Sequence, residues 1–220
     1  MIKAFLFDLN GTMIDDMEYH TKAWFDIVNN DLKANLTWEE VKKEMYGKNQ
    51  EVLVRIFGEG KFTMEEMNSI SIEKEKRYQK AFLPELKLIK GLDTFLEQAT
   101  AKKIKMAIGS AAIPFNIDFV LDNLNLRNTF SAVVSADDVT KSKPDPETFL
   151  KAAELLGVEP AACVVFEDAP KGVEAAQNAG MKTVVLTSAH EKEDFEQYTN
   201  IIAFAKDYTD AFFSDLLREG

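Results

Sequence analysis

Short apolar runs alternate with longer amphipathic segments along most of the chain. Runs rich in Val, Ile and Phe are typical of strands buried on both faces of a parallel sheet, and they occupy residues 3–7, 104–108, 132–135, 162–166 and 183–186. The amphipathic segments between them are long enough to be crossover helices, at residues 93–102, 114–123, 146–156 and 172–178. This alternation predicts an α/β fold with a doubly wound parallel sheet.

One region, from about residue 15 to residue 82, has helix signals and no convincing strand. Residues 16–30 are helical by pattern. Thr37 is followed three residues later by Glu40, and Thr63 by Glu66, which predicts a capping box at the start of two further helices. We therefore expect a core of residues 1–14 and 84–220 and an inserted helical cap domain of residues 15–83. The two connections favour a hinge over a static helical subdomain.

Composition narrows the class of protein. The chain has 220 residues, enough for one α/β domain with a sizeable insertion, and a formal net charge of -11, which disfavours nucleic acid and anionic membranes as partners. A single cysteine, Cys163, rules out an internal disulfide. The first apolar stretch is too short for a signal peptide, and no later run is long enough to span a bilayer. We expect a cytoplasmic monomer.

Polar residues follow the predicted strands at the points where the strands end. Asp8 follows the first run, Lys143 lies in a later loop, and Glu167 and Asp168 follow another run. In open α/β sheets, ligands bind at the carboxyl ends of the strands, near the point where the strand order reverses. Carboxylate oxygens there suit Mg²⁺, which bridges to a substrate phosphate. Lys143 would neutralise a carboxylate or phosphoryl oxygen, and Asp8 could attack phosphorus to give an aspartyl phosphate.

Smaller residues at the same strand ends suit phosphate binding. Ser110 follows the second run and offers a hydroxyl, and the neighbouring N–H groups, including that of Ala111, can bind phosphate oxygens. Gly11 lets the backbone approach closely beyond Asp8, and Thr12 is a further candidate for substrate contact. We expect Mg²⁺ and a small phosphorylated metabolite as ligands. Nothing in this set requires an organic cofactor.

Four short motifs in order, FDLNGT, IGS, KPDP and FEDA, resemble the signature motifs of the haloacid dehalogenase superfamily. The resemblance implies a Rossmann-like core, and the insert resembles the helical cap of the subgroup that contains β-phosphoglucomutase and sugar-phosphate phosphatases. It further implies Asp8 as the nucleophile, with Ser110 and Lys143 binding phosphate and balancing charge. The metal ligands that it implies are Asp8, Glu167, Asp168 and the backbone carbonyl of Asn10.

Asn10 departs from the superfamily pattern, which usually has Asp two positions after the nucleophile as general acid and base. An amide has no proton to exchange at neutral pH, so a contribution of ~10²–10⁴-fold is lost from this position. The superfamily's dehalogenases also lack the second Asp, but their chemistry needs no magnesium, whereas Glu167 and Asp168 indicate a metal. Asn10 is therefore consistent with a good leaving group or another base, with a long-lived phosphoenzyme, or with an engineered variant.

The insert offers further candidates for substrate contact. His20 resembles a histidine of β-phosphoglucomutase and could replace the missing base; the alternative is a histidine that packs at the hinge or on a helix surface. Where mutase-like proteins carry a glycine followed by an arginine, this chain has Gly47, Lys48, Asn49 and Gln50. Lys48, Asn49 and Gln50 are thus the candidates within the cap.

These observations favour hydrolysis of a small phosphorylated metabolite, such as a sugar phosphate, through an aspartyl phosphate at Asp8. One alternative is a β-phosphoglucomutase-like phosphomutase. Another is a protein that binds phosphorylated metabolites with little or no turnover, because Asn10 replaces the usual acid and base.

Overall fold

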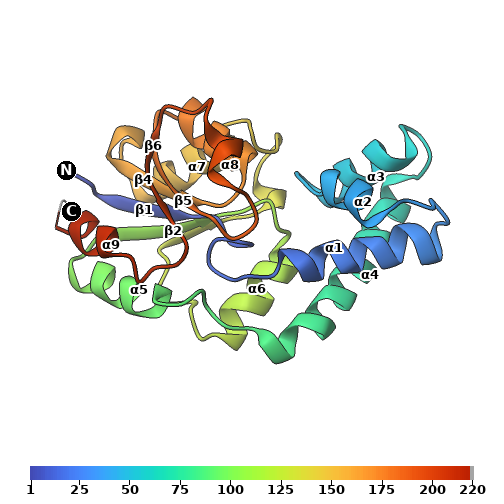
Figure 1. Cartoon of the computed structure of the whole chain (residues 1–220), viewed down its shortest axis with the longest axis horizontal. Helices are drawn as coiled ribbons and strands as arrows, with labels where there is room; N and C mark the ends of the chain where they lie inside the picture. Colours follow the sequence, from blue (N-terminus) through green and yellow to red (C-terminus); the bar gives the residue numbers. More distant parts are fainter. Residues whose placement is uncertain (219–220) are drawn as a thin grey trace. The chain divides into compact units, whose positions relative to one another are not determined.

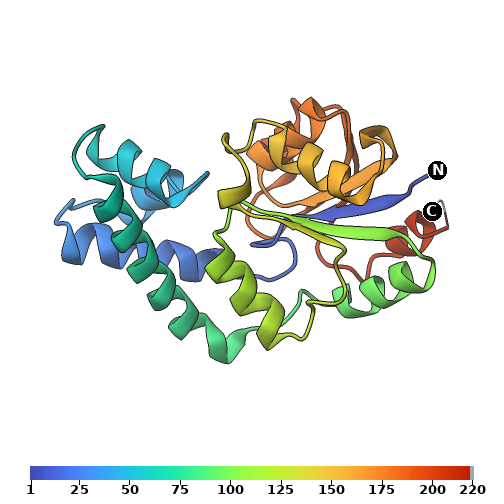
Figure 2. The same ribbon diagram turned by 180° about the vertical axis from the view of Figure 1, so that it is seen from behind.

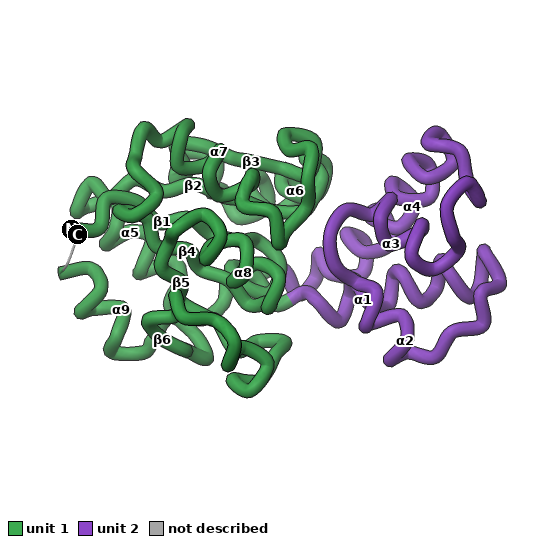
Figure 3. Tube along the Cα trace, turned by 90° about the horizontal axis from the view of Figure 1, so that it is seen from above, with its two compact units in different colours: residues 1–15, 87–220 green, residues 16–86 purple. Residues whose placement is uncertain are grey.

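The computed structural model describes residues 1–218 (Figure 1; Figure 2 shows the reverse side). The chain forms two compact units (Figure 3). Unit 1 consists of Met1–Asp15 and Lys87–Gly220, and unit 2 of Asp16–Leu86.

Unit 1 is built on a parallel sheet of six strands in the order β3-β2-β1-β4-β5-β6. The strands are β1 (Ala4–Phe7), β2 (Lys105–Gly109), β3 (Ala132–Val134), β4 (Cys163–Glu167), β5 (Lys182–Leu186) and β6 (Ile201–Ala205). The predicted doubly wound α/β fold is confirmed. The sequence pattern missed β6, because only a short 3-10 helix, Lys192–Phe195, lies between β5 and β6, so the strand–helix–strand rhythm stops there.

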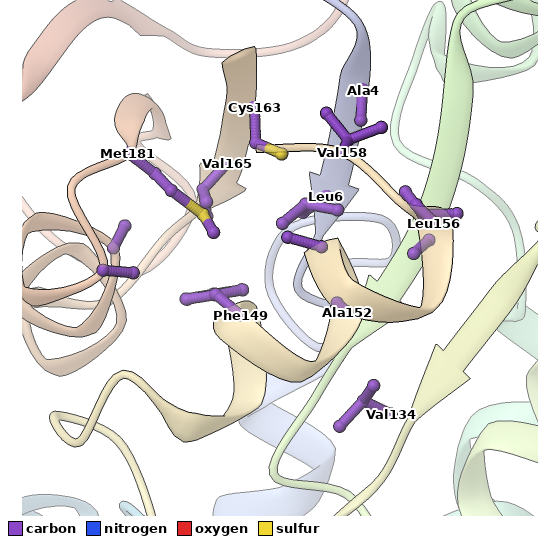
Figure 4. Packing of buried hydrophobic residues seen from close by; sticks show 14 of the residues in the cluster. Ala4, Leu6, Val134, Phe149, Ala152, Leu156, Val158, Cys163, Val165 and Met181 are labelled. Carbon is purple, nitrogen blue, oxygen red and sulfur yellow. The ribbon is translucent and has the colours of Figure 1, made fainter. Parts of the chain in front are cut away.

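Helices cover both faces of the sheet (Figure 1). In β1, Ala4 and Leu6 point to one face, where they pack with α7 and α8 in a buried apolar cluster (Figure 4). Phe5 and Phe7 point to the other face, where the ring of Phe5 stacks 5.3 Å from that of Phe95 in α5. A strand buried on both sides has no polar alternation, which explains the continuous apolar run AFLF. The helices of unit 1 are α5 (Leu92–Ala101), α6 (Pro114–Asn123), α7 (Glu147–Leu156), α8 (Pro170–Asn178) and α9 (Ala211–Leu216).

The strand order reverses between β1 and β4. From β1 the chain moves outward to β2 and β3, then returns to place β4 on the other side of β1 and continues outward to β5 and β6. Phe7 at the end of β1 is in register with Phe166 of β4. The residues that follow these two strands therefore emerge side by side at the switch point, the usual place for a ligand in such sheets.

Unit 2 is helical. Its helices are α1 (Met17–Phe25), continued by a π-helix (Asp26–Asp31), α2 (Trp38–Lys43), α3 (Asn49–Phe57), α4 (Met64–Phe82) and a 3-10 turn (Leu83–Glu85). Both predicted capping boxes are confirmed: Thr37 exchanges hydrogen bonds with Glu40 at the start of α2, and Thr63 with Glu66 at the start of α4. Trp24, Ile27 and Leu53 belong to the apolar core of the unit. Over the described residues, every helix is too short or too polar to cross a bilayer.

Candidate active site

Three buried carboxylates meet at the switch point of the sheet. Asp8 directly follows β1, Glu167 is the last residue of β4, and Asp168 comes next. The N–H of Asp8 donates to the carbonyl of Phe166 at 2.9 Å, which continues the pairing of the two strands up to the site. One oxygen of each carboxylate lies within 4.8 Å of the others. The sheet register thus brings together acidic residues that are far apart in the sequence.

Lys143 inserts its ammonium group between two of these carboxylates. Its Nζ lies 2.7 Å from Oδ1 of Asp8 and 2.7 Å from Oε1 of Glu167. It also lies 4.5 Å from the ring centre of Phe149. Burial disfavours the charged ammonium, but the attraction of Asp8 and Glu167 outweighs burial, so the pKa of Lys143 lies above its usual value. Lys143 is therefore a permanent cation that fixes the orientation of Asp8.

Asp168 is the third carboxylate of the cluster, and the single ammonium group of Lys143 lies between the other two. Burial, followed by repulsion from Glu167 and Asp8, raises the pKa of Asp168 well above its usual range. Its Oδ1 accepts a hydrogen bond from Oγ1 of Thr12 at 3.2 Å. Three close carboxylates facing one ammonium group form a set of hard oxygen donors with excess negative charge, which fits a divalent cation such as Mg²⁺.

Two glycines make room for the carboxylates. A Cβ atom on Gly11, whose φ is +73°, would lie 2.1 Å from Oδ2 of Asp168. A Cβ atom on Gly172, in the first turn of α8, would lie 1.7 Å from Oε1 of Glu167. The other oxygen of Glu167 accepts from the N–H groups of Asp168 and Ala169, each at 2.9 Å. Gly11 was predicted from the sequence to allow a close approach of the backbone, whereas the role of Gly172 was missed, although a glycine inside a helix usually has a packing reason.

The loop after β1 is held by two hydroxyl groups from the end of the chain. Oγ of Ser188, just beyond β5, donates to the carbonyl of Gly11 at 2.5 Å. The hydroxyl of Tyr208, beyond β6, donates to the carbonyl of Thr12 at 3.1 Å. Asn10 lies in this loop, half-buried, and its backbone forms a bridge with Ile14. Sequence reasoning missed both hydroxyls, because no local signal links residues separated by 177 and 196 positions.

Ser110 stands at the same edge of the sheet, directly after β2. It is buried, its N–H donates to the carbonyl of Val134 at 2.9 Å, and its Oγ accepts from the N–H of Ala112 at 3.1 Å. Ala111, between these two residues, is half-buried. Since β2 is the direct neighbour of β1, Ser110 and Ala111 lie one strand from Asp8.

His20 is a buried residue of α1 in unit 2, and its ring contacts α4. Its Nε2 is 3.3 Å from Oδ2 of Asp16, its Nδ1 is 2.6 Å from Nζ of Lys74, and its ring stacks on Tyr78 with centroids 3.7 Å apart. Both ring nitrogens therefore have polar partners within unit 2, as expected for a packing histidine. A role in substrate binding or catalysis stays a prediction.

The other candidates of unit 2 are also engaged within it. The N–H of Lys48 donates to Glu51 at 2.9 Å at the start of α3. Nδ2 of Asn49 donates to Glu75 at 2.7 Å. Nε2 of Gln50 donates to Oδ1 of Asn68 at 2.9 Å. The hydrogen bonds of Asn49 and Gln50 join α3 to α4, and contact of Lys48, Asn49 and Gln50 with substrate remains a prediction.

The chain is similar in sequence to known proteins. Residues 5–186 match the model of the haloacid dehalogenase-like hydrolase family. The chain is 35% identical over 189 residues to the β-phosphoglucomutase of Bacillus subtilis, covering 83% of this chain and 82% of the relative. It is 30% identical over 190 residues to fructose-1-phosphate phosphatase YqaB of Escherichia coli, covering 81% and 93%.

Solved structures share the fold over the whole chain. A HAD hydrolase of family IA, variant 3, from Entamoeba histolytica superposes with a TM-score of 0.84 at 25% identity, covering 99% of this chain and 100% of the other. A β-phosphoglucomutase from Clostridium difficile superposes with a TM-score of 0.84 at 24% identity, covering 100% and 98%.

Proposed function

The chain belongs to the haloacid dehalogenase-like hydrolase family, and from this premise we propose that it hydrolyses a small phosphorylated metabolite through an aspartyl phosphate on Asp8. The observation that carries the proposal is the position of Asp8 at the switch point of the sheet, held 2.7 Å from the ammonium of Lys143 within a cluster of buried carboxylates. A buried aspartate with a purely structural role after a strand would need neither a buried ammonium group nor two further carboxylates beside it.

We assign Mg²⁺ to the carboxylate cluster. Asp8, Glu167 and Asp168 would hold the ion, together with the backbone carbonyl of Asn10. Both oxygens of Glu167 accept hydrogen bonds, from Lys143 and from two backbone N–H groups, and these hydrogen bonds fix the position of its carboxylate in the cluster. When bound, the ion would offset the negative charge of the carboxylates and of the phosphoryl oxygens.

The residues of unit 1 then have separate roles in the reaction. A carboxylate oxygen of Asp8 forms a bond to phosphorus while the bond from phosphorus to the leaving oxygen breaks. Lys143 holds the carboxylate of Asp8 in position through its 2.7 Å hydrogen bond, and Ser110 with the N–H of Ala111 is proposed to bind the transferred phosphoryl group. Attack of water on the same phosphorus releases phosphate and restores the carboxylate of Asp8.

Proton transfer is where this chain differs from its family. The leaving oxygen of an alkyl phosphate needs a proton, and the water that attacks later must lose one. The amide of Asn10 can do neither. We therefore expect slow hydrolysis of alkyl phosphates and faster hydrolysis of aryl or acyl phosphates, whose leaving groups depart without a proton.

A sugar phosphate is the proposed substrate, because relatives that share about a third of their residues with this chain are named as a phosphoglucomutase and a fructose-1-phosphate phosphatase. The mutase remains the second candidate. It is favoured by the 35% identity to a β-phosphoglucomutase, and loss of the water-activating base would prolong the life of a phosphoenzyme. A binding protein with little turnover is the third. The monomeric state and the cytoplasmic location expected from the sequence stay proposals.

A panel of phosphate esters, assayed for phosphate release with Mg²⁺ and with excess chelator, tests this function. Asp8→Asn, which keeps the shape of the side chain, should abolish turnover, as should the chelator. Asn10→Asp should raise hydrolysis, by a factor within ~10²–10⁴ for alkyl phosphates and far less for acyl phosphates. Full activity of the Asp8 variant would refute covalent catalysis. If no ester is turned over by either the unsubstituted chain or the Asn10→Asp variant, the binding-protein hypothesis replaces the proposal.

A further inference from the structure

Lys143 lies in a loop that follows the edge strand of the sheet, and its side chain nevertheless reaches the carboxylate cluster at the switch point. β3 is the edge strand, two positions from β1, and the chain after it forms a 3-10 turn, Ala136–Asp138, before the loop that ends at α7. The side chain of Lys143 is nevertheless only 8% exposed, and its Nζ makes two hydrogen bonds of 2.7 Å. The backbone of residues 139–146 must therefore be held in one conformation.

One carboxylate, that of Glu147, ties the start of this loop to its end. Glu147 is the first residue of α7. Its two oxygens accept the N–H of Thr140, each at 3.0 Å, and one of them also accepts the hydroxyl of Thr140 at 2.8 Å and the N–H of Lys141 at 2.9 Å. These hydrogen bonds lower the pKa of Glu147 to about 2, so the carboxylate is charged throughout the neutral range.

Other contacts place the same helix and the same loop. Nδ2 of Asn178, the last residue of α8, donates to the carbonyl of Pro144 at 3.0 Å. Phe149, one helical half-turn beyond Glu147, is fully buried against the sheet and lies under the ammonium of Lys143. Helix α7 thus acts on Lys143 in two ways. Phe149 contacts the ammonium group directly, and Glu147 holds the loop backbone that carries Lys143.

We propose that Glu147 is a positioning residue for Lys143: it closes the loop of residues 140–146 so that the ammonium group stays between Asp8 and Glu167. Among the described residues, the carboxylate of Glu147 accepts hydrogen bonds from Thr140 and Lys141 and makes none to the carboxylate cluster itself. Its effect therefore passes entirely through the loop. The catalytic part of this inference rests on the proposed function, whereas the structural part, the protection of Lys143, does not.

The structural part is tested without substrate, by the rate at which reductive methylation labels each lysine. In the natural chain Lys143 should be protected. Glu147→Ala should speed its labelling by about tenfold or more, and Glu147→Asp, which keeps the charge, should restore part of the protection. Lys105, whose Nζ donates to the carbonyl of Leu156 at the far end of α7, serves as the internal reference for general loosening. Glu154→Ala, an exposed glutamate of the same helix, is the matched control.

Equal labelling of Lys143 in the natural chain and in Glu147→Ala would overturn the proposal, and so would a parallel rise at Lys105. The catalytic part is tested by a double-mutant cycle on kcat. Glu147→Ala should lower kcat by about tenfold to a hundredfold, as a small misplacement of a reacting group does, but should have no further effect in a Lys143→Ala background. If the two substitutions instead lowered kcat by the product of their separate factors, Glu147 would not act through Lys143. Full turnover of Lys143→Ala alone would instead refute the proposed function.

Discussion

Gly11 shows how a single residue sets the geometry of the site. Its φ of +73° favours glycine, and the space that a side chain would occupy is already filled by the carboxylate of Asp168. The carbonyl of Gly11 is held by Ser188, so the loop cannot simply move aside. Backbone conformation and side-chain space therefore require glycine here for two independent reasons.

Gly11→Ala should separate these two reasons. We expect the unfolding free energy of this variant to fall by the ~1–2 kcal/mol that a left-handed conformation costs an L-residue. The added methyl group should also displace Asp168, so that the affinity for Mg²⁺ measured by calorimetry and the turnover both fall by about tenfold or more. Gly180→Ala is the matched control, because φ at Gly180 is +72° and nothing lies within 4 Å of the added Cβ. Its unfolding free energy should fall similarly while Mg²⁺ affinity is unchanged. Equal loss of Mg²⁺ affinity in both variants would show that backbone strain alone is responsible.

At the scale of elements, α1 and α4 of unit 2 pack around buried charges. Lys74 of α4 is 2% exposed and contacts His20 of α1 and both oxygens of Glu75. Burial lowers the pKa of Lys74, although Glu75 and Asp16 oppose this. The hydroxyl of Tyr78, which donates to Asp16 at 2.5 Å, has a pKa raised by burial and by the nearby carboxylates. The two helices are thus joined by a network whose stability depends on pH.

The lowered pKa of Lys74 fixes the sign of that dependence. As pH rises toward the ordinary lysine pKa of about 10.4, the folded chain releases the Lys74 proton before the unfolded chain does, so the unfolding free energy should increase with pH. This increase of the unfolding free energy with pH should end near the ordinary tyrosine pKa of about 10. Above that pH, Tyr78 keeps its proton in the folded chain and loses it in the unfolded chain, so the unfolding free energy decreases with pH.

Urea denaturation between neutral pH and this limit provides the measurement. Lys74→Gln should lose the upward slope that the natural chain shows. Lys76→Gln, an exposed lysine of the same helix, should keep it. Parallel curves for the natural chain and the Lys74 variant would mean that Lys74 stays charged in the folded protein.

At the scale of the whole molecule, the chain carries a net charge of -11 and concentrates three carboxylates at one point of unit 1. Burying this charge without a cation opposes folding, and the raised pKa of Asp168 expresses that cost. A ligand that binds only the folded chain shifts the unfolding equilibrium in proportion to its affinity. We therefore expect that a metal ion bound at this cluster would stabilise the folded chain.

Mg²⁺ should stabilise the natural chain against thermal unfolding by about 2.7 kcal/mol at a concentration one hundred times the dissociation constant. Asp168→Asn, which removes one buried charge and keeps the shape, should be more stable than the natural chain in chelator and should gain much less from Mg²⁺. Melting curves at matched ionic strength, with K⁺ replacing Mg²⁺, provide the control. An equal gain in both proteins would place the ion outside this cluster.

The sequence alone determined the fold class and the family, which the sheet topology and the family match confirm, and it left phosphatase and phosphomutase as alternatives. These were readable because apolar periodicity, capping boxes and strand-end motifs are local signals. Even the meeting of Asp8 with Glu167 could be expected, since parallel strands bring their carboxyl ends to one edge.

Tertiary structure alone decided which distant groups hold these residues in place. Ser188 and Tyr208 hold the loop after β1, and Gly172 makes room for Glu167. Glu147 anchors the loop that carries Lys143. Such contacts depend on how separate elements pack, so no spacing in the chain encodes them. The edge strand β6 was missed although its sequence, IIAFA, is apolar, because only a short 3-10 helix separates it from β5 and the alternation of strand and helix stops there.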